Sequence, residues 1–247
     1  MNYFKEVEGL PISLISERVR FTPPAGPVNA NITVQQKKTG TTTVGIIGKE
    51  FVVLAADQQA TMGYMAADDD AKKIYKITSK VGLTISGAVG DSLMVIRYLK
   101  AQANLYEIER GTKITPKAIS NLLSNVLNGN RYYPFIFMPI IGGVNNKPQL
   151  YELTPFGCIS KKTKYAVTGS GTEFAIAVLD ADFRPEMAEE DAISLAVKAI
   201  MVSKNRDINT GGRTISMVII DKKEYRKVDE KEIEKAVAKV KLNFKKN

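Results

Sequence analysis

Apolar residues change their spacing several times along the chain, and these changes divide it into predicted strands and helices. Short β-branched runs between turn residues predict strands, whereas apolar residues three and four apart predict helices. The predicted strands cover residues 41–47, 51–56, 73–77 and 82–86, then 135–144, 149–153, 158–160 and 165–168, and finally 214–220. Several of these runs are continuously apolar, which indicates sheets that are covered on both faces.

Two predicted helices follow each block of strands, and one more follows the last strand. The clearest of them covers 116–129, where Thr115 is the cap and Pro116 takes the first-turn position. The others begin near Asp91, cover 173–182 and 189–205, and lie within 229–241. This order predicts an α+β fold, a four-layer αββα sandwich of two mainly antiparallel sheets flanked by helices.

The first 40 residues differ from the rest in composition. Three prolines in 21–27 prevent a helix or a central strand, and 29–39 is polar. We therefore expect residues 1–40 to be a leader and 41–247 to be the folded domain. The leader lacks the cationic start and long apolar run of a secretion signal, and no stretch reaches the roughly 20 apolar residues of a membrane span. A cytoplasmic protein without membrane contact is expected.

Composition excludes several classes of function. The chain has no histidine, which Ser-His-Asp and Cys-His hydrolases and most zinc sites require. No metal or cofactor is expected, and a hydrolase would need another general base. The single Cys158 cannot form an internal disulfide and is expected in the core. The net charge of +9 comes from scattered lysines, so nucleic-acid binding is not expected.

A threonine-rich segment lies where the leader ends and the first predicted strand begins. The segment reads Thr39-Gly40-Thr41-Thr42-Thr43-Val44-Gly45. By itself it does not indicate a function, because threonine is common in strands. Five further motifs follow in order: Leu54-Ala55-Ala56-Asp57 with Ala60-Thr61-Met62, Lys72-Lys73-Ile74, Ser86-Gly87-Ala88-Val89-Gly90-Asp91, Thr168-Gly169-Ser170-Gly171, and Asn205-Arg206-Asp207 with Gly211-Gly212. Together the six motifs resemble those of proteasome β subunits, most closely the archaeal type.

The resemblance implies an N-terminal-nucleophile hydrolase, a threonine-type endopeptidase. In that family the chain is cut after a glycine, so Gly40–Thr41 is the expected self-cleavage site and Thr41 the expected nucleophile. A threonine hydroxyl is a poor nucleophile without a base. The freed α-amine, with an ordinary pKa of about 7.7–8.0, can take its proton, whereas the amide of the precursor cannot. Gly40 lacks a Cβ, which lets the hydroxyl approach the preceding carbonyl.

The resemblance also assigns supporting roles. The ammonium of Lys73 is expected beside the nucleophile, with its charge balanced by Asp57, where it stabilises an alkoxide. Ser170 and Asp207 are expected to orient the amine, and the backbone N–H of Gly87 to bind the oxyanion. The alternatives are a structural ion pair, a turn serine and a helix-end aspartate.

The substrate is expected to bind as an added strand. By resemblance, the backbones of Thr61 and Val89 pair with an extended polypeptide, which gives affinity whatever its side chains. One pocket should then select an apolar residue before the scissile bond; its expected lining is Ala60, Ala71, Tyr75, Ile85 and Val89. Filling of the core is the alternative role for these side chains.

Three features depart from the family pattern. Gln58 and Gln59 stand where arginines are frequent, so any salt bridge made there is lost. Thr210 stands where serine is common, which keeps the hydroxyl and adds a methyl group. The 40-residue leader is longer than many archaeal ones.

The family also implies partners. The expected assembly is a 28-subunit α7β7β7α7 barrel of α subunits and other β subunits, in which unfolded polypeptides are cut inside a closed chamber and a regulatory ATPase ring acts indirectly. One alternative is a non-catalytic scaffold β subunit that supports a paralogue. Another is a relative of the bacterial two-ring ATP-dependent peptidase, whose chains are generally shorter.

Overall fold

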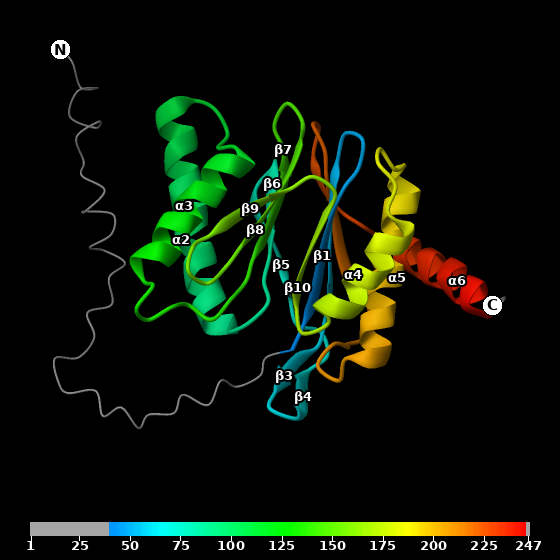
Figure 1. Cartoon of the computed structure of the whole chain (residues 1–247). Helices are drawn as coiled ribbons and strands as arrows, with labels where there is room; N and C mark the ends of the chain where they lie inside the picture. The colour runs from blue at the N-terminus through cyan, green and yellow to red at the C-terminus, as the bar shows by residue number, and fades with distance from the viewer. Residues whose placement is uncertain (1–39, 246–247) are drawn as a thin grey trace, which may run out of the picture.

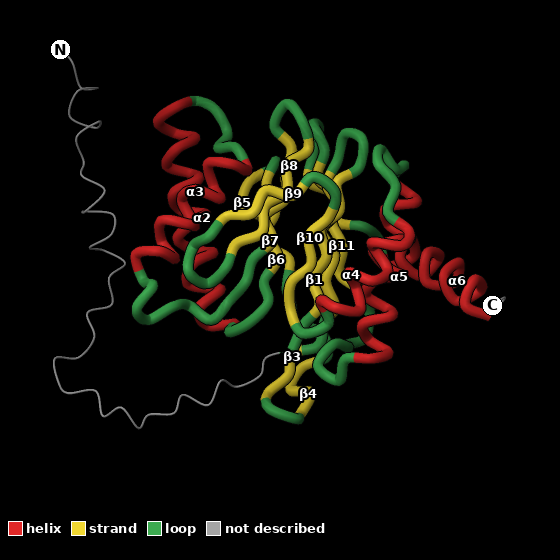
Figure 2. The backbone as a smooth tube through the Cα atoms, in the orientation of Figure 1, coloured by secondary structure: helices red, strands yellow, loops and turns green. Residues whose placement is uncertain are grey.

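The computed structural model describes residues 40–245, and its layers follow the predicted order. Two five-stranded sheets pack face to face in the centre (Figure 2). Helices α2 and α3 cover the outer face of one sheet, and α4 and α5 cover that of the other, with α6 packed beside α5 (Figure 1). The predicted four-layer sandwich is confirmed. Residues 1–39, which make up nearly all of the predicted leader, lie outside the described residues.

The first sheet has the strand order β10-β1-β2-β11-β12. Its strands are β1 (Thr42–Ile47), β2 (Val52–Asp57), β10 (Tyr165–Gly169), β11 (Ile215–Ile220) and β12 (Tyr225–Lys227). All neighbours in it are antiparallel, and Val44 of β1 lies opposite Ala55 on one side and Val167 on the other. The central β1 and β2 are almost entirely buried, as their continuous apolar runs predicted.

The second sheet has the order β5-β6-β7-β8-β9 and is also antiparallel. Its strands are β5 (Ile74–Thr78), β6 (Val81–Thr84), β7 (Ile140–Val144), β8 (Pro148–Leu153) and β9 (Ile159–Lys162). Between the two sheets lies a hydrophobic layer that includes Leu54, Ile140 and Leu150. Separate clusters fill the space between each sheet and its helices, so three apolar layers hold the four structural layers together.

The helices begin and end close to the predicted positions. They are α2 (Val89–Arg110), α3 (Pro116–Gly129), α4 (Thr172–Asp182), α5 (Glu189–Arg206) and α6 (Glu230–Lys245). The side chain of Thr115 accepts the N–H of Ala118, and Pro116 lies in the first turn of α3, which confirms the predicted cap. Within residues 40–245, no helix combines the length and apolar character that crossing a membrane requires.

Two expectations were wrong. The strand predicted over 135–144 begins only at Ile140, because Pro139 has no N–H to donate to a ladder; in 135–139 only Phe137 forms an isolated bridge, with Gly87. Cys158 is exposed rather than buried in the core, since it closes a tight turn with Thr154 just before the edge strand β9.

Three short strands were not predicted. β3 (Ala60–Met62) and β4 (Met65–Asp68) form a hairpin that projects from one end of the sandwich (Figure 1), and β12 is the third. β3 and β12 have three residues each, and all four residues of β4 are exposed. Such segments show no apolar alternation for a sequence pattern to detect.

Candidate active site

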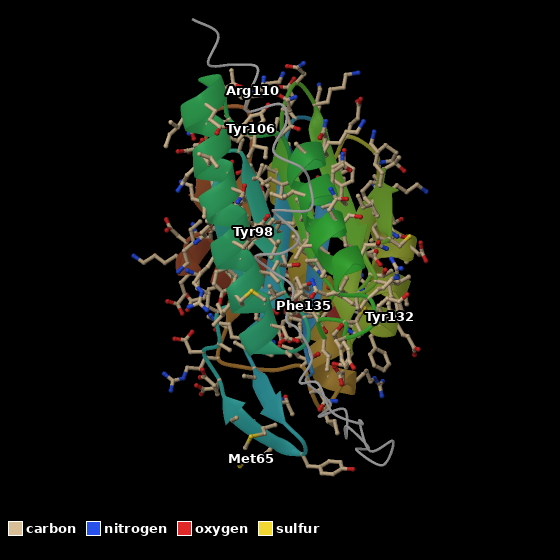
Figure 3. All side chains as sticks on the ribbon, turned by 90° about the vertical axis from the view of Figure 1, so that its left-hand side faces the viewer. Met65, Tyr98, Tyr106, Arg110, Tyr132 and Phe135 are labelled. Carbon is tan, nitrogen blue, oxygen red and sulfur yellow. The ribbon has the colours of Figure 1, made fainter. Side chains whose placement is uncertain are left out.

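The predicted catalytic residues gather at one end of the sandwich. Thr41 directly precedes β1 and Asp57 ends β2, so the antiparallel pairing of these two strands brings them to the same edge. Lys73 directly precedes β5 of the other sheet and reaches Asp57 across the space between the sheets. The β3–β4 hairpin projects from this end. Figure 3 shows Met65 of the hairpin and Arg110, the last residue of α2, at opposite ends of the molecule.

A buried ion pair forms the centre of the site. The ammonium of Lys73 donates to Oδ1 of Asp57 at 2.7 Å and to the backbone carbonyl of Gln59 at 2.6 Å. The same Oδ1 accepts the N–H of Thr42 at 2.9 Å, and Oδ2 accepts the N–H groups of Gln59 at 3.2 Å and Gly211 at 2.9 Å. Asp57 is 0% exposed and Lys73 5%, so this charge pair is removed from water.

Burial changes the acidity of two lysines at this end. It lowers the pKa of Lys73 below its ordinary value of 10.5, and the nearby charge of Asp57 and their hydrogen bond oppose that shift. Burial also lowers the pKa of Lys204, again against the attraction of Asp57. Lys204 extends from α5 and donates to the carbonyl of Gly212 at 2.8 Å, which helps to fix the segment that supplies the N–H of Gly211.

A second hydrogen-bond chain reaches the backbone of Thr41. The Thr41 N–H, an amide because the bond to Gly40 is intact in this chain, donates to the hydroxyl of Ser170 at 3.0 Å. Ser170 in turn donates to Oδ2 of Asp207 at 2.5 Å, and Oδ1 of Asp207 accepts the N–H of Asn209 at 3.1 Å. The structure therefore brings Ser170 and Asp207 together with Thr41.

Thr210, which stands where serine was expected, contacts both Asp207 and Thr42. Its hydroxyl donates to Oδ2 of Asp207 at 2.5 Å, so it must accept the proton of the Thr42 hydroxyl, 2.8 Å away. The threonine thus keeps the hydroxyl contact of a serine and is itself only 4% exposed. Thr42 is therefore held through its N–H by Asp57 and through its hydroxyl by Thr210.

Gly87 has a backbone that only glycine accepts easily. Its φ is +120°, and a Cβ would lie 2.3 Å from the carbonyl oxygen of Ile136. The bridge to Phe137 uses the carbonyl of Ser86 and the N–H of Ala88, not the N–H of Gly87. That N–H is thus not committed to the bridge, as an oxyanion donor requires.

Gly40 is enclosed by the loop after α5. A Cβ added to Gly40 would lie 1.6 Å from Cβ of Asn209 and 2.7 Å from its Cα. A side chain at position 40 therefore requires movement of the Gly40–Thr41 bond or of this loop, which also carries Asp207 and Thr210.

The predicted substrate-binding residues lie on segments around this end. Thr61 is in β3, and Val89, 49% exposed, is the first residue of α2, where a backbone N–H has no partner within the helix. Ala60, Ala71 and Tyr75 are half-buried, whereas Ile85 is buried in the cluster beneath α2 and α3. Their contacts with substrate stay a prediction.

Sequence reasoning missed several residues of the site, among them Thr42, Lys204 and Asn209. Only Thr42 gave a signal, its place beside the proposed nucleophile. Lys204 bonds a carbonyl in the loop after its own helix, and Asn209 contacts Gly40 and Thr61 far along the chain, so no local pattern marks either residue. In the part of the chain that the structure describes, no group of three or more Cys, Asp or Glu side chains could hold a metal ion.

A two-sheet αββα sandwich in which a threonine leads the first strand is the architecture of the N-terminal-nucleophile hydrolases. A family model described as "Proteasome subunit" matches residues 37–220. A proteasome subunit beta of Methanoregula boonei is 42% identical over 206 residues, covering 83% of this chain and 96% of that protein. The proteasome subunit beta 1 of Pyrococcus furiosus is 46% identical over 187 residues, with 76% and 95% covered. The chain belongs to the proteasome β subunit family.

Replacing Thr210 should show how far the site depends on its hydroxyl. Thr210→Val keeps the shape but leaves Oδ2 of Asp207 with one donor fewer and the Thr42 hydroxyl without its acceptor. We expect the free energy of unfolding to fall by about 1–3 kcal/mol, measured by urea denaturation of the full chain. Thr210→Ser, which keeps the hydroxyl, is the matched control and should lose less. Equal losses in the two variants would contradict this account.

Proposed function

We propose that this chain is a catalytic β subunit of a proteasome and that Thr41, freed by cleavage of the Gly40–Thr41 bond, is its nucleophile. The observation that carries the proposal is the buried Lys73–Asp57 pair, whose carboxylate also holds the N–H of the residue that follows Thr41. A structural ion pair alone would not explain why a second carboxylate, Asp207, reaches the Thr41 nitrogen through Ser170.

Maturation is the first reaction. The Thr41 hydroxyl oxygen loses its proton and attacks the carbonyl carbon of Gly40, the carbon–nitrogen bond breaks, and the proton passes to the nitrogen, which becomes a free amine. Water then hydrolyses the resulting ester and releases the leader. Because an amide nitrogen is not a base, the precursor lacks the proton acceptor that the mature enzyme uses.

Peptide hydrolysis then uses the new amine. Ser170 donates its hydrogen bond to Asp207, so its oxygen can accept an amine N–H and leave the nitrogen lone pair facing the Thr41 hydroxyl. The amine takes the hydroxyl proton as the oxygen attacks a peptide carbonyl, and passes it to the leaving amine. Lys73 stabilises the alkoxide, and the N–H of Gly87 the oxyanion. Water, activated by the same amine, releases the acyl group.

Broad substrate use follows from main-chain recognition. We infer that an extended, unfolded polypeptide pairs with the backbones of Thr61 and Val89, with an apolar residue preferred before the cut. Such a tolerant site is safe only when enclosed, which fits assembly with α subunits and other β subunits into stacked seven-membered rings in the cytoplasm, fed by an ATPase ring.

The decisive experiment compares assembled particles of the wild-type chain and Thr41→Ala. We expect the wild type to begin at Thr41 by intact mass and to hydrolyse fluorogenic peptides. Thr41→Ala should keep its leader and lose all turnover, whereas Thr41→Ser, which retains a hydroxyl, should be cut and keep activity. Assembled wild-type rings that retain the full-length chain would instead favour the scaffold role, and normal turnover by Thr41→Ala would refute the proposal.

The enclosure of Gly40 predicts how processing responds to a side chain there. Gly40→Ala places a Cβ against Asn209, and a shift of roughly 1 Å at the scissile bond should slow leader removal about a hundredfold. The measurement is a time course of cleavage by mass spectrometry. Gly40→Ala combined with Asn209→Gly removes part of the obstruction and should recover part of the rate. Wild-type maturation of Gly40→Ala would contradict the steric argument.

The lowered pKa of Lys73 predicts an alkaline limit to activity. Catalysis needs the amine neutral and Lys73 charged, so kcat/KM should rise through the amine pKa and then fall as Lys73 loses its proton. Because burial holds the pKa of Lys73 below 10.5, the fall should begin below that pH. The test is a pH profile on mature particles whose integrity is checked by size-exclusion chromatography. A plateau that continues above 10.5 would contradict it.

A further inference from the structure

Gln59 takes part in the site through two separate sets of contacts. Its main chain serves the catalytic pair: the N–H donates to Asp57, and the carbonyl accepts from Lys73. Its side chain points to different partners. The amide nitrogen donates to the hydroxyl of Thr61 at 3.1 Å and to the carbonyl of Ile208 at 3.1 Å.

The two side-chain partners belong to segments that the site must hold in register. Thr61 lies in β3, and Ile208 lies in the turn from Asp207 to Thr210. This turn holds Ser170 in place through Asp207. The hydroxyl of Thr61 also donates to the carbonyl of Asn209 at 3.3 Å. The Gln59 amide and the Thr61 hydroxyl thus bond each other and reach this turn at two points, the carbonyls of Ile208 and Asn209.

The hairpin that contains β3 depends on such connections. β3 and β4 form a two-stranded sheet of their own, which pairs with neither five-stranded sheet. An isolated two-stranded hairpin is marginally stable in water, so its position relative to the rest of the domain depends on contacts outside it. The backbone bond from the N–H of Arg213 to the carbonyl of Asp69 holds the end that follows β4, and the side-chain bonds of Gln59 and Thr61 hold β3. The Gln59 side chain is itself fixed by packing, because a Cβ on Gly211 would lie 2.1 Å from its Oε1.

We propose that the Gln59 side chain is a positioning residue for substrate binding: it fixes β3, and with it the backbone of Thr61, against the turn that orients the catalytic amine. This inference rests on the proposed function, in which Thr61 pairs with the substrate. A strand held in place before binding costs less free energy to order when an extended peptide adds to it.

Because the main chain and the side chain of Gln59 have different partners, the proposal predicts different effects on catalysis and on substrate binding. Replacing the side chain leaves the main-chain bonds to Asp57 and Lys73 in place, so the reactivity of Thr41 should persist. Binding of a peptide that needs the β3 backbone should weaken. A residue that only stabilises the fold would impair both properties together.

The experiment uses assembled, mature particles that carry Gln59→Met, which keeps the length of the side chain and removes its hydrogen bonds, or Gln59→Glu, which keeps the shape without the N–H donors. For a fluorogenic tetrapeptide, we expect KM to rise about tenfold through the loss of two hydrogen bonds, with kcat little changed. The rate at which a small electrophile without a peptide strand labels Thr41 should equal that of the wild type.

Gln58→Met is the matched control. The Gln58 side chain bonds Ser216 at 3.0 Å and the N–H of Thr214 at 3.1 Å, away from β3, so its loss should leave KM unchanged. An unchanged KM in both Gln59 variants would overturn the inference, as would parallel losses of hydrolysis and labelling. So would failure of both variants to assemble while Gln58→Met assembles. A wild-type particle without activity would instead refute the proposed function itself.

Discussion

The carboxylate of Asp57 is the interaction on which the site depends. It accepts hydrogen bonds from Thr42, the first residue of β1, from Lys73 at the entry to β5, from Gln59, and from Gly211 before β11. Asp57 belongs to one sheet and Lys73 leads into the other, so their ion pair also joins the two sheets. A buried carboxylate is costly unless fully paired, which favours the single arrangement of these segments that satisfies it.

The carboxylate of Asp207 also holds the start of β1, but through a chain of hydrogen bonds instead of an ion pair. Within residues 40–245, Asp207 receives hydrogen bonds from hydroxyl and N–H donors, among them Ser170 and Thr210, and from no ammonium group. Through them it reaches the nitrogen of Thr41 and the hydroxyl of Thr42. The first two residues of the domain are therefore fixed from two sides. Such a rigid start suits the proposed nucleophile, whose hydroxyl has to be held in a fixed position.

Local patterns predicted the elements that depend on local information. The stripe and cap of α3 and the apolar runs of β1 and β2 were found because helix and strand periodicity are properties of adjacent residues. The β3–β4 hairpin was missed because its place is decided by contacts such as that of Thr61 with Asn209, far along the chain. The catalytic set came from a resemblance, and its geometry could not be obtained from spacing alone.

The two glutamines show why a departure from a family pattern has to be judged atom by atom. The sequence predicted a lost salt bridge, yet position 59 serves Lys73 through its carbonyl, which any residue supplies. What changes is the side chain, and a neutral amide adds no second cation near Asp57. In the described residues Lys73 is the one cation in a salt bridge with Asp57, so the carboxylate need not be shared between two positive charges. Glutamine at position 59 therefore leaves the pair intact, because the contacts with Asp57 and Lys73 come from the main chain.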